Sequence, residues 1–266
     1  MKFIGTFPFG QPVQEVVQID CTPKGVFVLG VYASAVHARW INPDEKTVVN
    51  ALAVASEPYI FWRGENAESI IRKIAVPKEL GKLIPAKQGL NGPSGMALDN
   101  LILNPLGLDR QKAWLCDLVS HSCVNPSQSK AIERAYVPIA QKFGLANPTV
   151  PPVPNLLSDG KRRKAIMEEI IESKSRVLIL LGDKPIQWFL SYYDDHWKKL
   201  SDFGRDFKSY GQLHKVRIGG REIYVLPLAH PRQIGKLGMS SAVWYELHER
   251  WIDQSANMVA NSIRLE

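Results

Sequence analysis

A run of five aliphatic residues is the feature of this chain that most constrains its fold. Val177 to Leu181 contains no polar side chain and is followed directly by Gly182 and Asp183. An apolar run of this length is typical of a strand buried on both faces, as found in parallel sheets that helices cover. We therefore expect a strand over 176–181 inside an α/β protein.

Other short apolar runs predict the neighbouring strands, and amphipathic segments between them predict helices. Strands are expected at 24–31, 113–119 and 222–228. Helices are expected near 67–73 and at 96–103, 127–143, 159–173, 183–192 and 240–254. Ser127 is the expected N-cap of its helix, and Ser158 or Asp159 that of the next one. This alternation predicts a mostly parallel sheet with helices on both faces.

A turn-like sequence, Asn42-Pro43-Asp44-Glu45, separates two segments with strand character, 35–41 and 47–55. Such a composition between two strands predicts a β-hairpin. The proline-rich stretch 147–154 is expected to be an extended loop within one domain, since a helix and strands follow it directly. We therefore expect a single domain over 1–266, with a β-hairpin insertion at 35–55.

The composition is that of an ordinary globular protein. Hydrophobic residues make up 45% and charged residues 22% of the 266 positions, which excludes wholesale disorder. No apolar run reaches the roughly 18 residues that cross a bilayer. Residues 1–17 contain glycine and proline and do not resemble a secretory signal. Three cysteines, an odd number in a long chain, argue against a disulfide framework, so we expect a protein of the reducing cytoplasm. We also expect a monomer with no membrane partner.

The basic excess is concentrated in one part of the chain. The whole sequence has 33 basic and 26 acidic residues, a net charge of +7. Residues 198–236 alone contain nine basic and three acidic residues, and Lys161 to Lys164 form a second basic cluster. Two interpretations remain open for these clusters: a solvated charged face, or a surface that contacts phosphates.

Several familiar chemistries are excluded by the motifs that the sequence lacks. It has no dinucleotide fingerprint, no Walker A sequence, no His-Glu-x-x-His and no Gly-x-Ser-x-Gly. The glycine-rich segment 89–95 lacks the lysine of a phosphate loop. A metal site built from His121, Cys123 and His230 would match no common zinc spacing. We therefore expect no metal and no cofactor.

The residues to examine lie where the predicted strands end, because parallel α/β sheets bind ligands at the carboxyl ends of their strands. These positions are 32–34, 117–123, Asp183 and His230. Four segments around them resemble, in order and spacing, the uracil-DNA glycosylase superfamily, and most closely its thermostable iron–sulfur branch. The segments are Val28-Leu29-Gly30-Val31-Tyr32-Ala33-Ser34, Gly92 to Asp99 with its continuation through Gly107 to Asp117, Leu180-Leu181-Gly182-Asp183, and Leu226-Pro227-Leu228-Ala229-His230-Pro231-Arg232.

This resemblance implies a three-layer α/β/α sandwich with a four-stranded, mostly parallel sheet, and an enzyme that cleaves the glycosidic bond of a base flipped out of DNA. It assigns catalytic roles to His230, which would stabilise the departing base, to Asp117, which would read the base edge or activate water, and to Tyr32. It places Ser34, Leu90, Asn91 and His121 around the base. It places Ser94, Arg232, Gln233, Ile234 and Lys236 on the DNA, where residues 232–234 would supply a wedge.

The sequence departs from the family in three respects that matter for chemistry. Tyr32 stands where the family has a carboxylate or an asparagine that orients water, and a tyrosine hydroxyl is a poor base at neutral pH. Asp117 stands where an asparagine reads the base. An ionised carboxylate only accepts hydrogen bonds, so we expect a donor-rich base edge and not simple uracil. The four cluster cysteines are missing, so we expect no iron–sulfur cluster.

Two alternatives to a glycosylase remain open. The first is a non-catalytic protein that binds nucleic acid or a nucleotide on the same fold. The second is an unrelated small-molecule hydrolase on a similar α/β frame, in which Cys123 would be the nucleophile and His121 or His230 its base.

Overall fold

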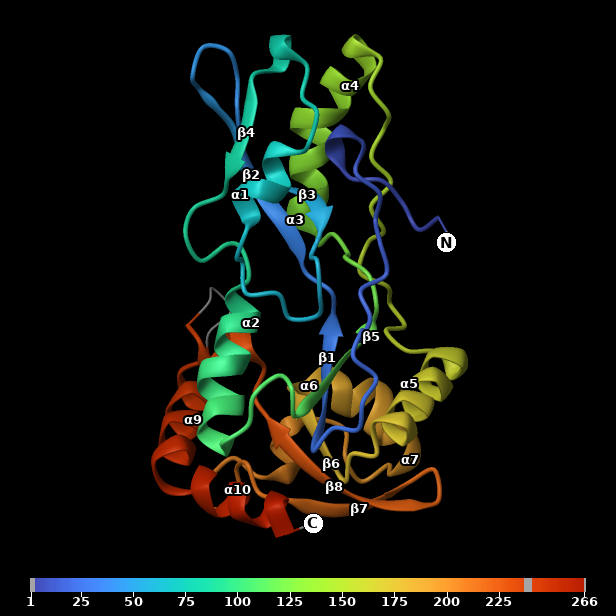
Figure 1. The fold of residues 1–266 in the computed structure, drawn as a ribbon, viewed down its shortest axis with the longest axis vertical. Helices are drawn as coiled ribbons and strands as arrows, with labels where there is room; N and C mark the ends of the chain where they lie inside the picture. Colours follow the sequence, from blue (N-terminus) through green and yellow to red (C-terminus); the bar gives the residue numbers. More distant parts are fainter. Residues whose placement is uncertain (1–2, 237–240, 266) are drawn as a thin grey trace. The chain divides into compact units, whose positions relative to one another are not determined.

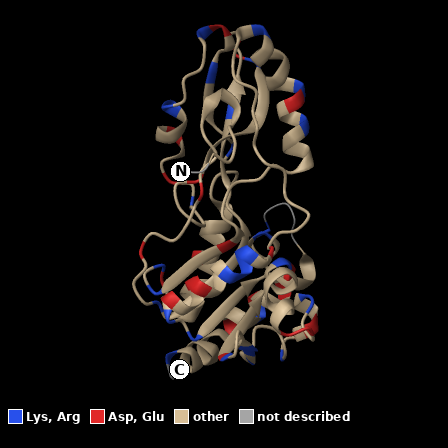
Figure 2. Ribbon diagram, turned by 90° about the vertical axis from the view of Figure 1, so that its right-hand side faces the viewer, with Lys and Arg blue, Asp and Glu red and all other residues tan. Residues whose placement is uncertain are grey.

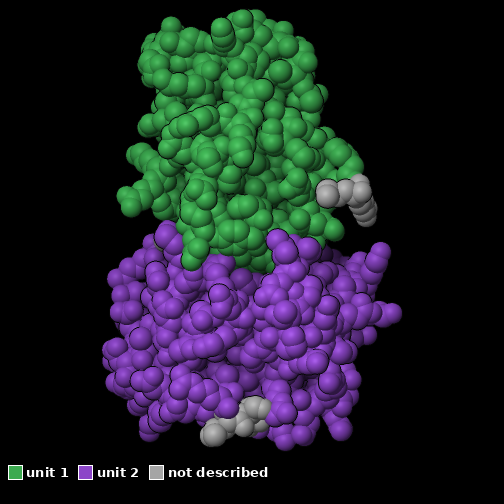
Figure 3. Space-filling model, in the orientation of Figure 1, with its two compact units in different colours: residues 1–16, 32–93, 120–155 green, residues 17–31, 94–119, 156–266 purple. Residues whose placement is uncertain are grey.

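The computed structural model describes residues 3–236 and 241–265. The chain divides into two compact units, each assembled from three separate stretches (Figure 3). Unit 1 comprises residues 1–16, 32–93 and 120–155, and unit 2 comprises residues 17–31, 94–119 and 156–266. The expectation of one domain stays a prediction.

Unit 2 contains the predicted parallel sheet, with one more strand than expected. Its order is β5 (Ala113–Val119), β1 (Val26–Tyr32), β6 (Val177–Leu181), β8 (Arg221–Leu228) and β7 (His214–Ile218). The β1–β6 and β6–β8 pairs are parallel, and β7 is an antiparallel edge strand. At β5, Val26 donates its N–H to Lys112, which precedes the strand, so both strands start at the same edge. The sheet therefore has four expected strands plus β7.

Helices cover both faces of this sheet (Figure 1). One side has α2 (Pro93–Leu98), which continues as a helical run to Leu106, together with α9 (Ala242–Gln254) and α10 (Ala256–Leu265). The other side has α5 (Gly160–Ser173), and a helical run that comprises α6 (Asp183–Pro185), residues 186–190 and α7 (Ser191–Tyr193). All residues of β5 and β6 are buried, as two covered faces require.

Unit 1 is built on a separate three-stranded antiparallel sheet. Its order is β3 (Thr47–Ser56), β2 (Ala35–Ile41) and β4 (Lys82–Pro85). The helices of this unit are α1 (Ala67–Arg72) and a run formed by α3 (Pro126–Ala131), residues 132–136 and α4 (Val137–Phe143). Phe9, Trp40 and Tyr136 meet edge to face in its core, with ring centroids 4.9 to 6.3 Å apart.

Most of the predicted elements are confirmed. The hairpin is β2–β3, with antiparallel pairing from Ala35–Ser56 to Ile41–Thr47. Asp159 caps α5 by accepting a hydrogen bond from the N–H of Arg162. The prediction of Ser127 as a cap was wrong, because Asn125 and Gln128 form a capping box around the first turn of α3. The strands β4 and β7 and the helices α8 (Pro231–Ile234) and α10 were not predicted, and neither were the short 3-10 helices.

Candidate functional site

The carboxyl ends of the parallel strands in unit 2 form the candidate site. In chain order β1 is the first parallel strand, β5 the second, and β6 and β8 follow on the opposite side of β1. β5 and β6 therefore lie on opposite sides of β1, which makes the end of β1 a topological switch point. Parallel α/β sheets bind ligands at the strand ends beside such a point. In unit 2 this edge includes Val31, Asp117, Gly182 and His230.

Asp117 is a buried carboxyl group near the end of β5, with 4% of its surface exposed. Burial raises its pKa to about 7, since water no longer solvates the charged form, and the positive charge of Arg162 only partly opposes this rise. The Val31 backbone N–H donates a hydrogen bond to the carboxylate. Asp117 therefore titrates near neutral pH, unlike an ordinary aspartate.

Arg162 of α5 supports the strand end that carries Asp117. Its guanidinium donates to the main-chain oxygens of Asp117, at 2.6 Å, and of Leu118, at 3.1 Å. It also pairs with Glu169 at 3.1 Å, and Glu169 accepts a hydrogen bond from the indole of Trp114 at 3.1 Å. Arg162 therefore positions the backbone of Asp117, while the Asp117 carboxyl group keeps a raised pKa.

His230 is the N-cap of the short helix α8 (Pro231–Ile234). Its Nδ1 accepts a hydrogen bond from the backbone N–H of Arg232 at 3.2 Å, which assigns the proton of the neutral ring to Nε2. Burial, with a smaller contribution from the charge of Arg232, lowers the pKa of His230 to about 4. At neutral pH this side chain is therefore an uncharged hydrogen-bond donor.

Glycine is required next to His230 because two strand ends approach closely there. Gly182, which follows β6, has a φ of +82°, and a Cβ built on it would lie 3.1 Å from the Cβ of His230. A larger residue at 182 would displace the histidine and strain the backbone. The Leu-Leu-Gly-Asp segment thus sets the position of the His-Pro loop.

A buried chain of hydrogen bonds fixes the residue before His230. The hydroxyl of Tyr210 accepts from the backbone N–H of Ala229 at 3.0 Å and lies 2.8 Å from Nδ1 of His248. Nε2 of His248 lies 2.8 Å from the carbonyl oxygen of Leu101, so the ring donates there and accepts from Tyr210 at Nδ1. Burial lowers the pKa of His248 to about 4, so this chain is made by a neutral ring.

The loop after His230 does not supply all of the predicted DNA contacts. Ile234 is 1% exposed, so the prediction that it wedges into DNA was wrong: it packs in the core. Gln233 accepts a hydrogen bond from the backbone N–H of His230 at 3.2 Å. Arg232 and Lys236 are exposed, and Lys236 lies over the ring of Tyr245. Ser94 is half-buried at the start of α2.

In unit 1, the segment predicted to hold the base is engaged in structural contacts. Asn91 accepts from the backbone N–H of His37 at 2.8 Å and donates to its carbonyl at 3.0 Å. A Cβ on Gly92 would lie 1.9 Å from the carbonyl carbon of Arg63, so this glycine permits close backbone contact. Leu90 is 42% exposed. A structural role therefore accounts for Asn91 and Gly92.

Ser34, His121 and Cys123 also lie in unit 1. The hydroxyl of Ser122 donates to the carbonyl of Ser34, and Nδ1 of His121 lies 3.8 Å from the sulfur of Cys123. Burial raises the pKa of Cys123 to about 11, so its thiol is protonated at neutral pH. A protonated thiol is a poor nucleophile, which weakens the case for a cysteine hydrolase.

The predicted catalytic residues fall into different units. Asp117 and His230 belong to unit 2, whereas Tyr32, the last residue of β1, is the first residue of its stretch of unit 1. The strands of Asp117 and His230 are separated by β1 and β6, so roughly 14 Å of sheet lies between them. Within unit 2 the two groups therefore share one sheet edge without touching each other.

The basic residues of 198–236 do not form one surface. Arg221 lies at the amino-terminal edge of the sheet and Lys215 pairs with Tyr224 in the middle of β8, whereas Arg232 and Lys236 follow the carboxyl-terminal edge. The length of β8, roughly 25 Å, separates Arg221 from the residues that follow the strand. Figure 2 shows Lys and Arg interspersed with Asp and Glu along unit 2. The basic residues that are clustered in the sequence are thus spread over different parts of unit 2.

Two residues that position the site, Tyr210 and His248, were not singled out from the sequence. His248 had a signal, because it follows Trp244 by four residues and precedes Trp251 by three, which places it on the same helical face. Tyr210 lies in a segment without periodicity, so nothing in the sequence marked it. Among the described residues, one group could hold a metal ion, formed by the half-buried Asp194 and the exposed Asp195 and His196.

Comparisons with known proteins give no family for this chain. Neither the protein-family models nor the curated proteins include a match to it. Within the described residues, no helix combines the length and apolar character needed to cross a membrane.

Proposed function

We propose that this protein is a DNA glycosylase-like enzyme that hydrolyses the N-glycosidic bond of a damaged or modified base flipped out of DNA. The observation that carries the proposal is the state of His230, a neutral ring whose Nδ1 is already used as an acceptor. Its Nε2–H is left as a fixed donor. The departing base develops negative charge, and a preorganised neutral donor stabilises that charge without reorganisation.

The raised pKa of Asp117 supports the proposal and broadens the set of candidate bases. The protonated carboxyl group offers one donor and one acceptor, which matches a base edge with a carbonyl and a ring N–H. The ionised form accepts hydrogen bonds only, or removes a proton from water. The expectation of a donor-rich edge therefore applies only above pH 7, where Asp117 is mostly ionised.

A second candidate function, binding without catalysis, is favoured by Tyr32. A tyrosine hydroxyl holds water but does not deprotonate it at neutral pH. If Asp117 does not activate water in its place, the protein binds nucleic acid and leaves the glycosidic bond intact.

The first test is a panel of labelled oligonucleotides, single- and double-stranded, that carry uracil, hypoxanthine, oxidised and alkylated bases. The protein is added in excess, and alkali then cleaves the strand at any abasic site that has formed. We expect cleaved product from at least one of the lesions. Binding that falls steeply with salt, without any abasic product, would establish the second candidate instead.

Variants of His230 test the mechanism once a substrate is found. His230→Ala is expected to lower the single-turnover rate by roughly 10²–10³, the cost of removing one donor to a developing anion. The matched control is His196→Ala, because the His196 side chain is 85% exposed and lies outside the site. Equal rates for wild type and His230→Ala would refute the proposed role.

Asp117→Asn separates the two roles of that residue. An asparagine also offers a donor and an acceptor, so a base-reading Asp117 predicts retained activity and a wild-type rate that falls above pH 7. A water-activating Asp117 predicts a rate that rises toward pH 7 and a loss of roughly 10²–10⁴ in Asp117→Asn.

A further inference from the structure

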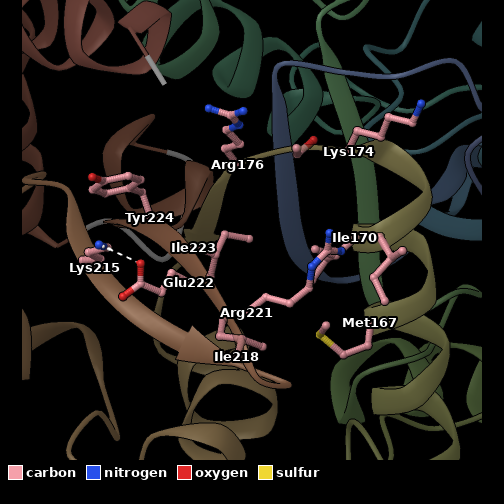
Figure 4. A pocket seen from close by; sticks show the side chains of 12 residues that line it. Met167, Ile170, Lys174, Arg176, Lys215, Ile218, Arg221, Glu222, Ile223 and Tyr224 are labelled. Carbon is pink, nitrogen blue, oxygen red and sulfur yellow. Dashed lines mark ion pairs between the residues drawn. The ribbon is translucent and has the colours of Figure 1, made fainter.

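A cleft of about 400 Å³ lies at the amino-terminal edge of the unit 2 sheet, at the opposite edge from His230 (Figure 4). The end of α5, the starts of β6 and β8 and the end of β7 surround it. Five apolar side chains line it, namely Met167, Ile170, Ile171, Ile218 and Ile223. Ile171 is 49% exposed, so apolar surface faces solvent there.

Cations surround this apolar surface. Lys174, Arg176, Lys215 and Arg221 line the cleft with a single acid, Glu222, which pairs with Lys215 at 2.8 Å. In the described part of the chain, no carboxylate lies within ion-pair distance of Lys174 or Arg221. Figure 4 shows Arg221 extending from β8 toward Ile170 on α5. The cleft therefore presents positive charge beside an apolar floor.

The two uncompensated cations are held by defined backbone turns. Arg221 follows the tight turn Gly219-Gly220, and its pairing with Ile218 fixes its register. Lys174 ends α5 with a φ of +54°, a left-handed conformation that glycine usually supplies at this position. This conformation carries an energetic cost for lysine, and it fixes the backbone from which the Lys174 side chain lines the cleft.

We propose that this cleft binds a small organic anion, with a phosphate or carboxylate group held by Lys174 and Arg221 and an apolar body lying on the isoleucines. Its volume falls in the range of small-molecule sites. A DNA backbone would need the cations but not the apolar floor. This binding does not depend on the glycosylase function. It gives a role to Lys215 of β7 and Arg221 of β8, which do not belong to the His-Pro loop.

The test uses 1-anilinonaphthalene-8-sulfonate, an apolar anion whose fluorescence rises when it is bound. Saturable binding is expected, and 1-naphthyl phosphate should displace the probe at concentrations at least tenfold below those of inorganic phosphate, because it also covers the floor. Lys174→Gly and Arg221→Ala should each weaken binding about tenfold, the loss of one charge-assisted contact.

Lys174→Gly also distinguishes binding from folding. Removing a left-handed lysine should raise the urea midpoint while it weakens binding, and a purely structural residue would not show both changes. Lys198→Ala, on the exposed segment before residue 200, is the matched control and should bind as wild type does. Absence of saturable binding, wild-type affinity in both cleft variants, or equal potency of inorganic phosphate would each overturn the proposal.

Discussion

Replacing Asp117 by asparagine should make the protein more stable at alkaline pH, although it removes a residue of the candidate site. In the unfolded chain this carboxyl group ionises near its ordinary pKa of 3.8, whereas in the folded protein it keeps its proton up to about pH 7. Between these values the unfolded state binds fewer protons, so stability falls as pH rises. This loss of unfolding free energy is complete once the pH exceeds the folded-state pKa of about 7.

The size of the effect follows from the same pKa values. A rise from 3.8 to about 7 corresponds to about 4 kcal/mol of unfolding free energy at high pH. Asparagine carries no charge, and its amide oxygen can still accept the N–H of Val31. Its NH₂ group introduces a buried donor that costs roughly 1–3 kcal/mol if it is unpaired. We therefore expect a net gain of about 2 kcal/mol at pH 8 and a net loss of roughly 1–3 kcal/mol at pH 4, where only the cost of the buried donor remains.

Urea unfolding at pH 8 and pH 4, followed by tryptophan fluorescence, measures this difference. The slopes of free energy against urea should agree between the two proteins, so that the midpoints report stability. Asp99→Asn is the control, because Asp99 pairs with Arg110 at 2.8 Å and its loss should destabilise the protein. Lower stability of Asp117→Asn at pH 8, or the same difference at both pH values, would refute the reasoning.

Three further predictions follow from the buried hydrogen-bond chain and from the two units. Tyr210→Phe removes the hydroxyl that joins Ala229 to His248 and should lower the unfolding free energy by about 2 kcal/mol in urea titrations, whereas Tyr245→Phe, whose hydroxyl bonds Glu249 at the surface, should change it by less than about 0.5 kcal/mol. His248 and His230 both stay neutral down to about pH 4 when folded, so their contributions are present above pH 6.5 and are lost as pH falls toward 4. In the Asp117→Asn background the part due to His248 should be about 3 kcal/mol, and His248→Gln should remove that part while the similar contribution of His230 remains. If the chain is one cooperative domain, unfolding curves from fluorescence and from circular dichroism should coincide, and separated transitions would show two independent units.

The strands of unit 2 were predictable because a continuous apolar run requires burial on both faces. The runs at 113–119 and 177–181 match β5 and β6 almost residue for residue. The missed strand β7 also had a signal, since Gly219-Gly220 separates two segments with strand character and forms a two-residue hairpin turn. Asn125-Pro126 followed by Gln128 likewise indicates the start of a helix.

The candidate site was predictable only in part. Asp117, near the end of one buried strand, and His230, just after another, stood out because ligands bind at the carboxyl ends of such strands. Their protonation states were not predictable, because these depend on burial and on partners distant in sequence. Tyr210 and His248 likewise form a hydrogen bond although they are 38 positions apart in the sequence, so no local pattern could predict that contact. The buried position of Ile234 follows from packing that no local pattern expresses.

The way the chain alternates between the two units has a practical consequence for dissecting the protein. The boundaries fall after residues 16, 31, 93, 119 and 155. Trimming either terminus therefore never isolates a unit, and a single nick by a protease separates neither. Expressing unit 2 by itself requires two internal splices, Val31 to Ser94 and Val119 to Leu156, and both fall at the carboxyl ends of strands, β1 and β5. A shortened protein made in this way would therefore be altered at the carboxyl-terminal edge of the sheet, which is the edge that carries the candidate site.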